Sequence, residues 1–343
     1  MIGLMIALKS MSKRIVQKPK MKAPLPIRDG LNPSRIRLPL DAEPIRAIDF
    51  VEYLISTQRH RNPDDDARAL QARFDANLVV NHYGEPYAPD DLVQPDDDIW
   101  FYRMPAHERP IPYKIHVIFE DEDLLVVDKP PYLASMPRGR HITETALVKM
   151  RVLTGNNDLT PAHRLDRLTS GVLVMVKKPE LRGAYQTLFA RREASKTYEA
   201  IANYVPDLIA EGEATVWESR IEKERGIVQA FVVDGPHNAR TELVSVTPVS
   251  DEEQQVLEKM HGPLPRQARY VLAPSTGKTH QLRIHMRDFA APILGDPLYP
   301  VLHGVDDEDY TTPMHLIART LTFIDPQTKE ERTFVSQRPT GSL

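Results

Sequence analysis

Residues 161–174 read PAHRLDRLTSGVLV, and the apolar run continues as GVLVMVKK over residues 171–178. A nearly continuous apolar run of this length predicts a strand that is buried on both faces of a sheet. Shortly before it, Asp166 stands between Arg164 and Arg167, and a Thr-Ser-Gly turn leads into the strand. The stretch therefore joins a single carboxylate to a rigid element of the core.

The patterns around this strand mix helices and strands without a regular alternation. Predicted helices span residues 143–155, 179–193 and 280–289, and predicted strands span 123–130, 196–205, 241–249 and 268–276. Because no strict strand–helix–strand rhythm connects them, the sequence predicts an α+β fold. We expect a mixed, largely antiparallel sheet with flanking helices.

The chain divides into three regions of different composition. Residues 1–40 hold nine Lys or Arg and one acid, a net charge of +8 that predicts a basic, disordered arm. Residues 41–105 predict a small α/β module in which a helix precedes short strands. Residues 112–343 predict a large domain, in which 250–268 and 303–312 are expected to be surface insertions.

The composition excludes several kinds of chemistry. The chain has 343 residues and no cysteine, which rules out disulfides, thiolate nucleophiles and cysteine-ligated metals. No segment reaches the ~18 apolar residues of a membrane span, and residues 2–8 lack the flanks of a signal peptide. We therefore expect a cytoplasmic protein. The net charge of −4 does not itself indicate nucleic-acid binding, and the basic arm is either a phosphate contact or a solvated tail.

Two apparent motifs fail on their spacing. Residues 275–279, STGKT, end like a nucleotide-binding P-loop, but Leu272 stands where that motif needs a glycine. His280 and His285 are five residues apart, so a helix would turn them to different faces, unlike a zinc-binding pair. We therefore expect no nucleotide cofactor and no metal.

Asp166 has two interpretations. An aspartate is ionised at neutral pH, and neighbouring arginines favour the ionised form. The side chain is then suited to act as a nucleophile, a proton acceptor or an electrostatic stabiliser, rather than as an acid. The alternative is a structural ion pair in a surface loop.

Several stretches resemble, in the same order, motifs of the RluA family of pseudouridine synthases. They are VVDKPPYLASMP (126–137), HRLDRLTSGVLV (163–174), ASKTYEAI (194–201), TGKTHQLRIHM (276–286) and APILGDPLY (291–299). The resemblance covers roughly residues 112–325. This chain departs from it at Lys278, where the family usually has arginine, and at Pro131 or Tyr132, where it usually has glycine.

The resemblance implies a role for each matched residue. Asp166 would be the catalytic aspartate, and Arg164 would displace the target base from its stack. Tyr198 would stack on the target uracil, and Arg283 would pair with the catalytic carboxylate. Leu282 would pack at the active site. The residues alone also allow a purely structural interpretation, in which Tyr198 is an ordinary aromatic residue of a strand and Arg283 is a charge on a helix surface.

The implied partner is ribosomal or transfer RNA. Candidate RNA contacts are the basic residues Arg138, Arg167, Lys196, Lys278 and Arg287. The implied reaction converts uridine to pseudouridine without oxidation, group transfer or hydrolysis, and so without a cofactor. Residues 41–105 stand where many relatives carry a small αL-type RNA-binding domain. We expect a monomer.

Two other classes of function stay open at this point. One is an RNA-binding protein of the same fold without catalytic activity. The other is an aspartate-dependent N-glycosidase that releases free uracil from nucleosides. In the synthase itself, Asp166 would either attack the sugar directly or take a ribose proton to give a glycal.

Overall fold

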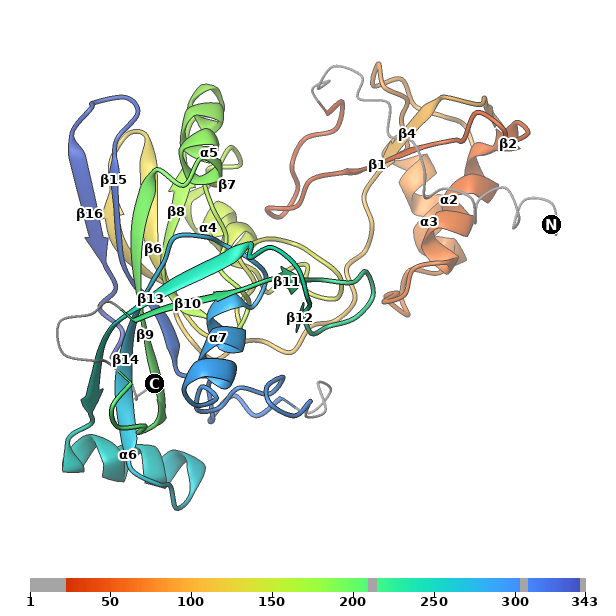
Figure 1. Ribbon diagram of the computed structural model, residues 1–343. Coiled ribbons are helices and arrows are strands. Elements are labelled where there is room, and N and C mark those ends of the chain that lie inside the picture. Colours follow the sequence, from red (N-terminus) through yellow and green to blue (C-terminus); the bar gives the residue numbers. More distant parts are fainter. Residues whose placement is uncertain (1–22, 209–214, 303–307, 340–343) are drawn as a thin grey trace. The chain divides into compact units, whose positions relative to one another are not determined.

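The computed structural model describes residues 23–208, 215–302 and 308–339 (Figure 1). These residues form two compact units. The first unit comprises the described residues up to Arg109 together with 138–143 and 151–157. The second unit comprises 110–137, 144–150 and the described residues from Asp158 onward. None of the described helices is long and apolar enough to cross a membrane.

The first unit packs helices against short antiparallel strand pairs. Its elements are β1 (Ser34–Arg37), β2 (Ile45–Arg46), α2 (Ala47–Ser56), α3 (Ala67–Asp75), β3 (Leu92–Val93) and β4 (Asp98–Phe101), with β1 paired to β4 and β2 to β3. Its core is built from apolar residues of both helices and of β4, among them Phe50, Phe74 and Ile99. Asp66 begins α3 by accepting hydrogen bonds from the main-chain N–H groups of Arg68 and Ala69.

The structure moves the boundary that the sequence predicted for the basic arm. Residues 1–22 lie outside the described residues, but Ser34–Arg37 form a strand of the first unit. The guanidinium of Arg35 donates to the Asp98 carboxylate at 2.7 Å, and that of Arg37 donates to it at 3.0 and 3.1 Å. The prediction of a disordered arm reaching residue 40 was therefore wrong for this strand, because Asp98 neutralises charges that looked unpaired in the sequence.

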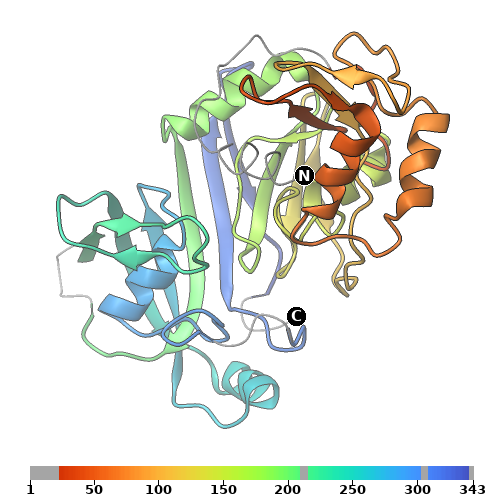
Figure 2. The same ribbon diagram turned by 90° about the vertical axis from the view of Figure 1, so that its right-hand side faces the viewer.

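The second unit is built on one large sheet. Its strands are β5 (His116–Glu120), β6 (Leu124–Lys129), β7 (Thr160–Pro161), β8 (Ser170–Val176), β9 (Ala194–Asn203), β10 (Thr215–Ser219), β13 (Ala239–Pro248), β14 (Gln267–Pro274), β15 (Leu316–Ile324) and β16 (Glu331–Val335). Their order is β10-β13-β14-β9-β15-β8-β6-β5, with β16 paired to β15 and β7 to β8. The long strands β9 and β15 lie side by side (Figure 2). The β8–β15 pair is parallel and the other pairs of this sheet are antiparallel, which confirms the predicted α+β class.

The remaining elements of the second unit lie around this sheet. They are the first part of α4 (Ala146–Thr154), the 3₁₀ turn Pro179–Leu181, α5 (Arg182–Ala190), the short pair β11 (Ile221–Glu222) and β12 (Phe231–Val232), α6 (Asp251–His261) and α7 (Gln281–Phe289). The residues of α4 from Arg151 onward belong to the first unit. The helix α6 lies in a region predicted only as a surface insertion. Ser250 begins it by accepting a hydrogen bond from the main-chain N–H of Glu253. That Ser-x-x-Glu spacing is the signal that the sequence offered for this helix.

The strand β8 is buried along its whole length, as its sequence predicted. Leu173 and Met175 face the main core, whereas Val172 and Val174 face a second core that includes Tyr185 and other residues of α5. Alternate side chains thus fill opposite faces of the sheet, so the strand contains no polar residue between Gly171 and Val176.

Gly171 allows β8 to begin in its parallel pairing with β15. Its φ is +109°, a conformation that side chains disfavour. A Cβ at this position would overlap the main-chain atoms of Ala318 on β15. Glycine is therefore required at the end of the loop that carries Asp166.

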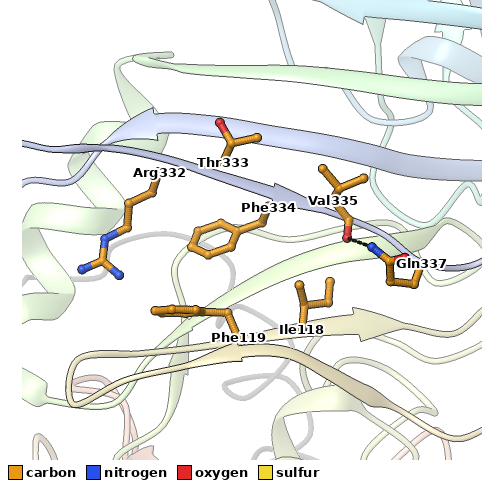
Figure 3. Close-up of a pocket in the computed structure, with 7 residues that line it drawn as sticks. All are labelled: Ile118, Phe119, Arg332, Thr333, Phe334, Val335 and Gln337. Atoms are coloured by element: carbon orange, nitrogen blue, oxygen red, sulfur yellow. Dashed lines mark hydrogen bonds between the residues drawn. The ribbon is translucent and has the colours of Figure 1, made fainter.

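An open pocket lined by both apolar and polar side chains lies between β5 and β16 (Figure 3). Its lining residues are Ile118, Phe119, Arg332, Thr333, Phe334, Val335 and Gln337. The rings of Phe119 and Phe334 lie 5.3 Å apart at its floor. The pocket contains none of the site residues that the sequence predicted.

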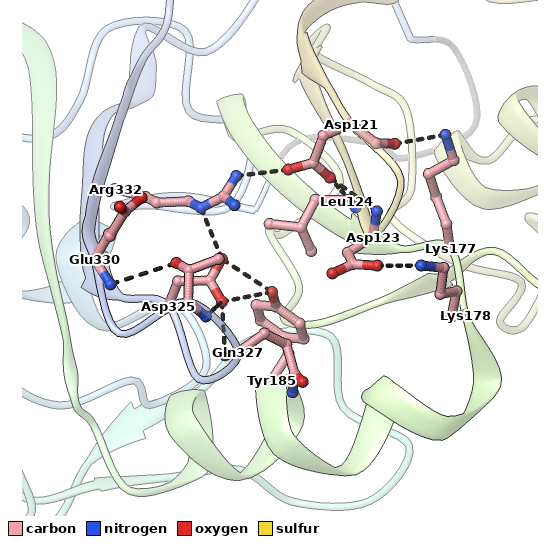
Figure 4. Close-up of polar contacts among 11 residues, drawn as sticks. Asp121, Asp123, Leu124, Lys177, Lys178, Tyr185, Asp325, Gln327, Glu330 and Arg332 are labelled. Carbon is pink, nitrogen blue, oxygen red and sulfur yellow. Dashed lines mark hydrogen bonds and ion pairs between the residues drawn. The ribbon is translucent and has the colours of Figure 1, made fainter.

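A hydrogen-bond and ion-pair network around the buried Asp325 carboxylate holds α5 to two turns of the sheet (Figure 4). The Tyr185 hydroxyl donates to the Asp325 carboxylate at 3.0 Å, and Nε of Arg332 contacts the same carboxylate at 2.7 Å. The same guanidinium reaches Asp121 at 2.7 Å. Because the buried charge of Asp325 is paired with Arg332, this network fixes the turn between β15 and β16.

Candidate active site

Asp166 lies in the loop between β7 and β8 and is partly buried. Its main-chain oxygen accepts a hydrogen bond from the N–H of Thr169 at 3.1 Å, which closes the turn before β8. Its carboxylate makes no hydrogen bond or ion pair with any residue in the described part of the chain. The surface ion pair with Arg164 or Arg167 is therefore not formed, and both carboxylate oxygens remain available.

The main chain on both sides of Asp166 is held by side chains of the segment 129–135. The Ser135 hydroxyl bonds to the main chain of Leu165, and Nζ of Lys129 donates to the carbonyl of Arg167 at 3.2 Å. These contacts join residues that are 30 and 38 positions apart in the sequence. They give the loop a fixed path past the carboxylate.

Lys129 is fully buried at the end of β6. Its ammonium group also donates to the carbonyls of Pro130 at 3.0 Å and Leu133 at 2.7 Å. Burial lowers the pKa of Lys129 well below its ordinary value, and the nearby guanidinium groups of Arg167 and Arg338 lower it further, while the charge of Asp166 opposes them. The lysine is thus an internal brace that binds the main-chain carbonyls of Pro130, Leu133 and Arg167.

Tyr198 projects from β9, opposite Leu272 of β14 and Ala318 of β15. Its ring packs against the main core. Burial raises the pKa of the Tyr198 hydroxyl, and the negative charge of Asp166 raises it further. The phenol is therefore neutral near pH 7 and lies within electrostatic reach of Asp166.

Arg283 and Leu282 lie in α7, and both side chains are buried. The Arg283 side chain is only 2% exposed, so it is not a charge on the helix surface. Its Nε and Nη2 contact the two oxygens of Asp296 at 2.7 and 2.5 Å. The turn that follows α7 brings this second carboxylate onto the guanidinium, and the predicted pairing of Arg283 with Asp166 stays a prediction.

Asp296 is itself held in place by the main chain of its own turn. Its Oδ1 accepts hydrogen bonds from the N–H groups of Leu298 at 2.8 Å and Tyr299 at 3.3 Å. The ring of Tyr299 lies 5.2 Å from the Arg283 guanidinium. The stretch APILGDPLY thus supplies the groups that orient Arg283, a role the sequence alone did not assign.

His280 stands at the start of α7 in a left-handed conformation, with φ of 59°. Its Nδ1 lies 3.0 Å from the hydroxyl of Tyr299. Burial lowers the pKa of His280 to about 4, and Arg283 acts in the same direction, whereas Asp166 and Asp296 oppose the shift. The imidazole is therefore neutral at pH 7, and Asp166, Arg283 and Asp296 all act on it electrostatically.

The predicted RNA contacts fall into two groups. Lys278 is exposed, as a contact to phosphate requires, and Arg138 is exposed in the first unit. Arg164, the residue predicted to displace the target base, is exposed as well. Lys196 is partly buried with its ammonium 5.2 Å from the ring of Phe189, and burial lowers its pKa. Arg138, Lys196 and Lys278 therefore stay predicted RNA contacts.

The other two arginines are engaged within the protein. Arg167 forms an ion pair with Glu308 and donates to the carbonyl of Tyr132 at 3.0 Å. Arg287 pairs with Asp288 at 2.5 and 2.9 Å. Each guanidinium would have to leave an intramolecular carboxylate in order to bind phosphate, so these two are weaker candidates.

Tyr132 occupies one of the two places, Pro131 or Tyr132, where the resemblance led us to expect glycine. It adopts the left-handed conformation that glycine favours, with φ of 64°. Its hydroxyl donates to the carbonyls of Asp309 and Thr312, at 2.7 and 2.9 Å. At Tyr132 the main chain therefore has a conformation that glycine favours, and the hydroxyl anchors the segment 308–314.

No group of three or more His, Asp or Glu side chains that could hold a metal occurs in 23–208, 215–302 or 308–339. His285 is buried, and its two ring nitrogens lie 2.9 Å from the hydroxyls of Ser219 and Thr241. This histidine ties α7 to β10 and β13 and does not pair with His280.

Comparison with known proteins supports one family. The family model for RNA pseudouridylate synthases matches residues 123–288, a range that contains Asp166, Tyr198 and Arg283. The dual-specificity RNA pseudouridine synthase RluA of Yersinia pestis is 32% identical over 215 residues, which cover 58% of this chain and 96% of that protein.

Two further relatives match a longer part of the chain. An uncharacterised RNA pseudouridine synthase of Mycoplasma pneumoniae is 27% identical over 254 residues, covering 72% of this chain and 76% of that protein. The mitochondrial tRNA pseudouridine(32) synthase of Saccharomyces cerevisiae is 27% identical over 254 residues, and the chain spans only 50% of its length.

Among solved structures, human RNA pseudouridylate synthase domain containing 4 aligns with 65% of this chain and 88% of that chain, at 24% identity and a TM-score of 0.46. The sequence relatives carry the assignment, since the Yersinia protein is covered almost completely at more than 30% identity. This chain belongs to the RluA-type family of RNA pseudouridine synthases, which are isomerases.

Proposed function

We propose that the protein converts specific uridines of structured ribosomal or transfer RNA to pseudouridine, with Asp166 as the catalytic carboxylate. The observation that carries this proposal is the environment of the Asp166 side chain. It is partly buried, its main chain is braced on both sides, and its carboxylate has no partner among the described residues. A carboxylate held in this way is suited to react with a bound substrate rather than to stabilise the fold.

The reaction needs no atom from outside the RNA. The bond between C1′ of the ribose and N1 of uracil breaks, the uracil turns, and a bond forms between C1′ and C5. C5 then loses its proton and N1 gains one, so the product has the mass of the substrate. Asp166 either attacks C1′ to give a covalent ester or removes a ribose proton to give a glycal.

The other side chains at this locus suit the remaining steps. The neutral ring of Tyr198 can hold the detached uracil by stacking, which is worth ~1–3 kcal/mol per base in single-strand binders. The exposed Arg164, two residues before Asp166, can fill the space left by a flipped nucleotide. The buried Arg283–Asp296 pair fixes α7 to the turn that follows it.

The names of the relatives support RNA as the substrate. The yeast relative is named for a uridine in transfer RNA, and the Yersinia relative is named as a dual-specificity RNA enzyme. We infer a substrate of the same class for this protein.

Product analysis tests the proposal against N-glycosidase activity. The protein is incubated with cellular RNA from a strain that lacks it. The RNA is then digested to nucleosides, which are separated by chromatography and identified by mass spectrometry. The proposal predicts pseudouridine at the expense of uridine and no free uracil. Free uracil with abasic sites would instead establish a glycosidase, and unchanged RNA that is nevertheless bound would establish an inactive binding protein.

A further inference from the structure

Ser135 makes an unusual pair of hydrogen bonds to the residue before Asp166. Its Oγ–H donates to the carbonyl of Leu165 at 2.8 Å, and its Oγ accepts from the N–H of Leu165 at 3.0 Å. Ser135 is 4% exposed and Leu165 is 6% exposed. One buried hydroxyl therefore satisfies both polar groups of the Leu165 main chain.

These bonds replace the strand pairing that would normally support such a residue. Leu165 lies between β7 and β8 and belongs to neither strand. The main chain of a buried residue needs hydrogen-bond partners, and an unpaired buried group costs about 1–3 kcal/mol. Without the Ser135 hydroxyl, the segment before Asp166 would have to shift in order to satisfy its N–H and C=O.

Ser135 is itself fixed by rigid structure. Its carbonyl accepts a hydrogen bond from the N–H of Leu147 in α4 at 3.2 Å, and the carbonyl of Ala134 accepts from Ala146 at 2.7 Å. The hydroxyl thus ties the start of a helix to the loop of Asp166. On the other side of the carboxylate, Lys129 holds the carbonyl of Arg167.

We propose that Ser135 is a positioning residue that sets the location of the Asp166 carboxylate through the main chain of Leu165. The inference rests on the proposed function, because it assumes that the Asp166 carboxylate must meet the ribose of the substrate. Ser135 does not touch the substrate. It acts on the rate of the chemical step, since a misplacement of about 1 Å can lower a rate about 100-fold.

The test compares Ser135→Ala with the parent enzyme in single-turnover reactions on an RNA that the parent modifies. We expect the rate constant at saturating enzyme to fall by about 10- to 100-fold, with the Kd for RNA within about threefold of the parent. Ser135→Thr keeps the hydroxyl and should recover most of the rate. Ser135→Cys keeps the shape with a weaker hydrogen-bonding group and should give an intermediate rate.

Ser170→Ala is the matched control. Ser170 is 5% exposed and donates one hydrogen bond to the carbonyl of Leu316 at 3.3 Å, away from the main chain next to Asp166. This variant also removes a buried hydroxyl, should lose no more stability than Ser135→Ala, and should keep the parent rate. All rates are measured at least 20 °C below each melting temperature, and Ser135→Cys replaces Ser135→Ala if the latter is unfolded there.

Equal rates for Ser135→Ala and Ser170→Ala would overturn the proposal. A loss confined to RNA affinity would also overturn it, because it would assign Ser135 to binding. A parent enzyme that forms no pseudouridine would instead refute the proposed function, so the two failures are distinguishable.

Discussion

The Tyr198 side chain illustrates how a single residue can serve both the core and the site. Its ring packs against the main core, while its hydroxyl makes no hydrogen bond within the described residues. The fold therefore needs the ring and does not need the hydroxyl. If uracil stacks on this ring, the chemistry has the same requirement.

We therefore expect Tyr198→Phe to retain activity within about fivefold and Tyr198→Leu to lose more than about 100-fold, with both variants folded. Single-turnover assays at saturating enzyme, with melting curves for each variant, measure this difference. Equal losses from the two substitutions would contradict stacking and would indicate proton transfer by the hydroxyl.

At the scale of elements, apolar periodicity predicted β8, α5 and α7 close to their observed bounds. Each of these three elements has a long pattern of apolar residues with one clear period. The strand β1 was missed because its pairing with β4 depends on Asp98, which lies more than 60 residues away. Non-local partners of this kind leave no signal in a local window.

The start of β8 depends on Gly171, and this dependence can be tested. Gly171→Ala should destabilise the protein by at least about 2 kcal/mol, because a Cβ would overlap the main chain of Ala318 at a φ of +109°. Gly183→Ala is the matched control, since a Cβ in that turn of α5 meets nothing within 4 Å. The control should be neutral or stabilising by up to about 1 kcal/mol. Urea unfolding of both variants gives the comparison, and a Gly171→Ala variant as stable as the control would refute the role assigned to the glycine.

At the scale of the whole molecule, the sequence predicted the class of site better than its internal contacts. The order of the quoted stretches led to Asp166, Tyr198, Leu282 and Arg283. It did not reveal Lys129 and Ser135 as braces of the Asp166 loop, or Asp296 as the partner of Arg283. These roles arise from side chains that meet main-chain groups or charges across the fold, and only the folded structure brings them together.

Several buried histidines make the stability of the whole protein sensitive to acid. Burial lowers the pKa of His163 and His315 to about 3 and the pKa of His285 to about 4, from an ordinary value of 6.5. The unfolded chain therefore binds more protons than the folded protein between about pH 6.5 and pH 3. Their stabilising contribution is complete above pH 6.5 and is lost progressively as the pH falls.

We expect the free energy of unfolding to be lower by several kcal/mol at pH 5.0 than at pH 7.5. His285→Gln should remove roughly 1–2 kcal/mol of this difference, since the amide can bond to Ser219 and Thr241 without titrating. His60→Gln, at an exposed position, should leave the difference unchanged. Urea titrations at the two pH values measure this difference in the free energy of unfolding. Equal stability at both pH values would contradict the conclusion that these histidines are buried and neutral.

The most direct test of the account replaces the carboxylate of Asp166. Asp166→Asn keeps the size and main-chain path of the residue but removes the ionised group, and Asp158→Asn alters an exposed carboxylate in the same region. Both are assayed for pseudouridine formation in single turnovers on an RNA that the parent enzyme modifies. We predict that Asp166→Asn binds the RNA and melts within about 5 °C of the parent while its rate falls at least about 10⁴-fold, and that Asp158→Asn is unaffected. A folded Asp166→Asn variant whose rate stays within tenfold of the parent would contradict the central claim.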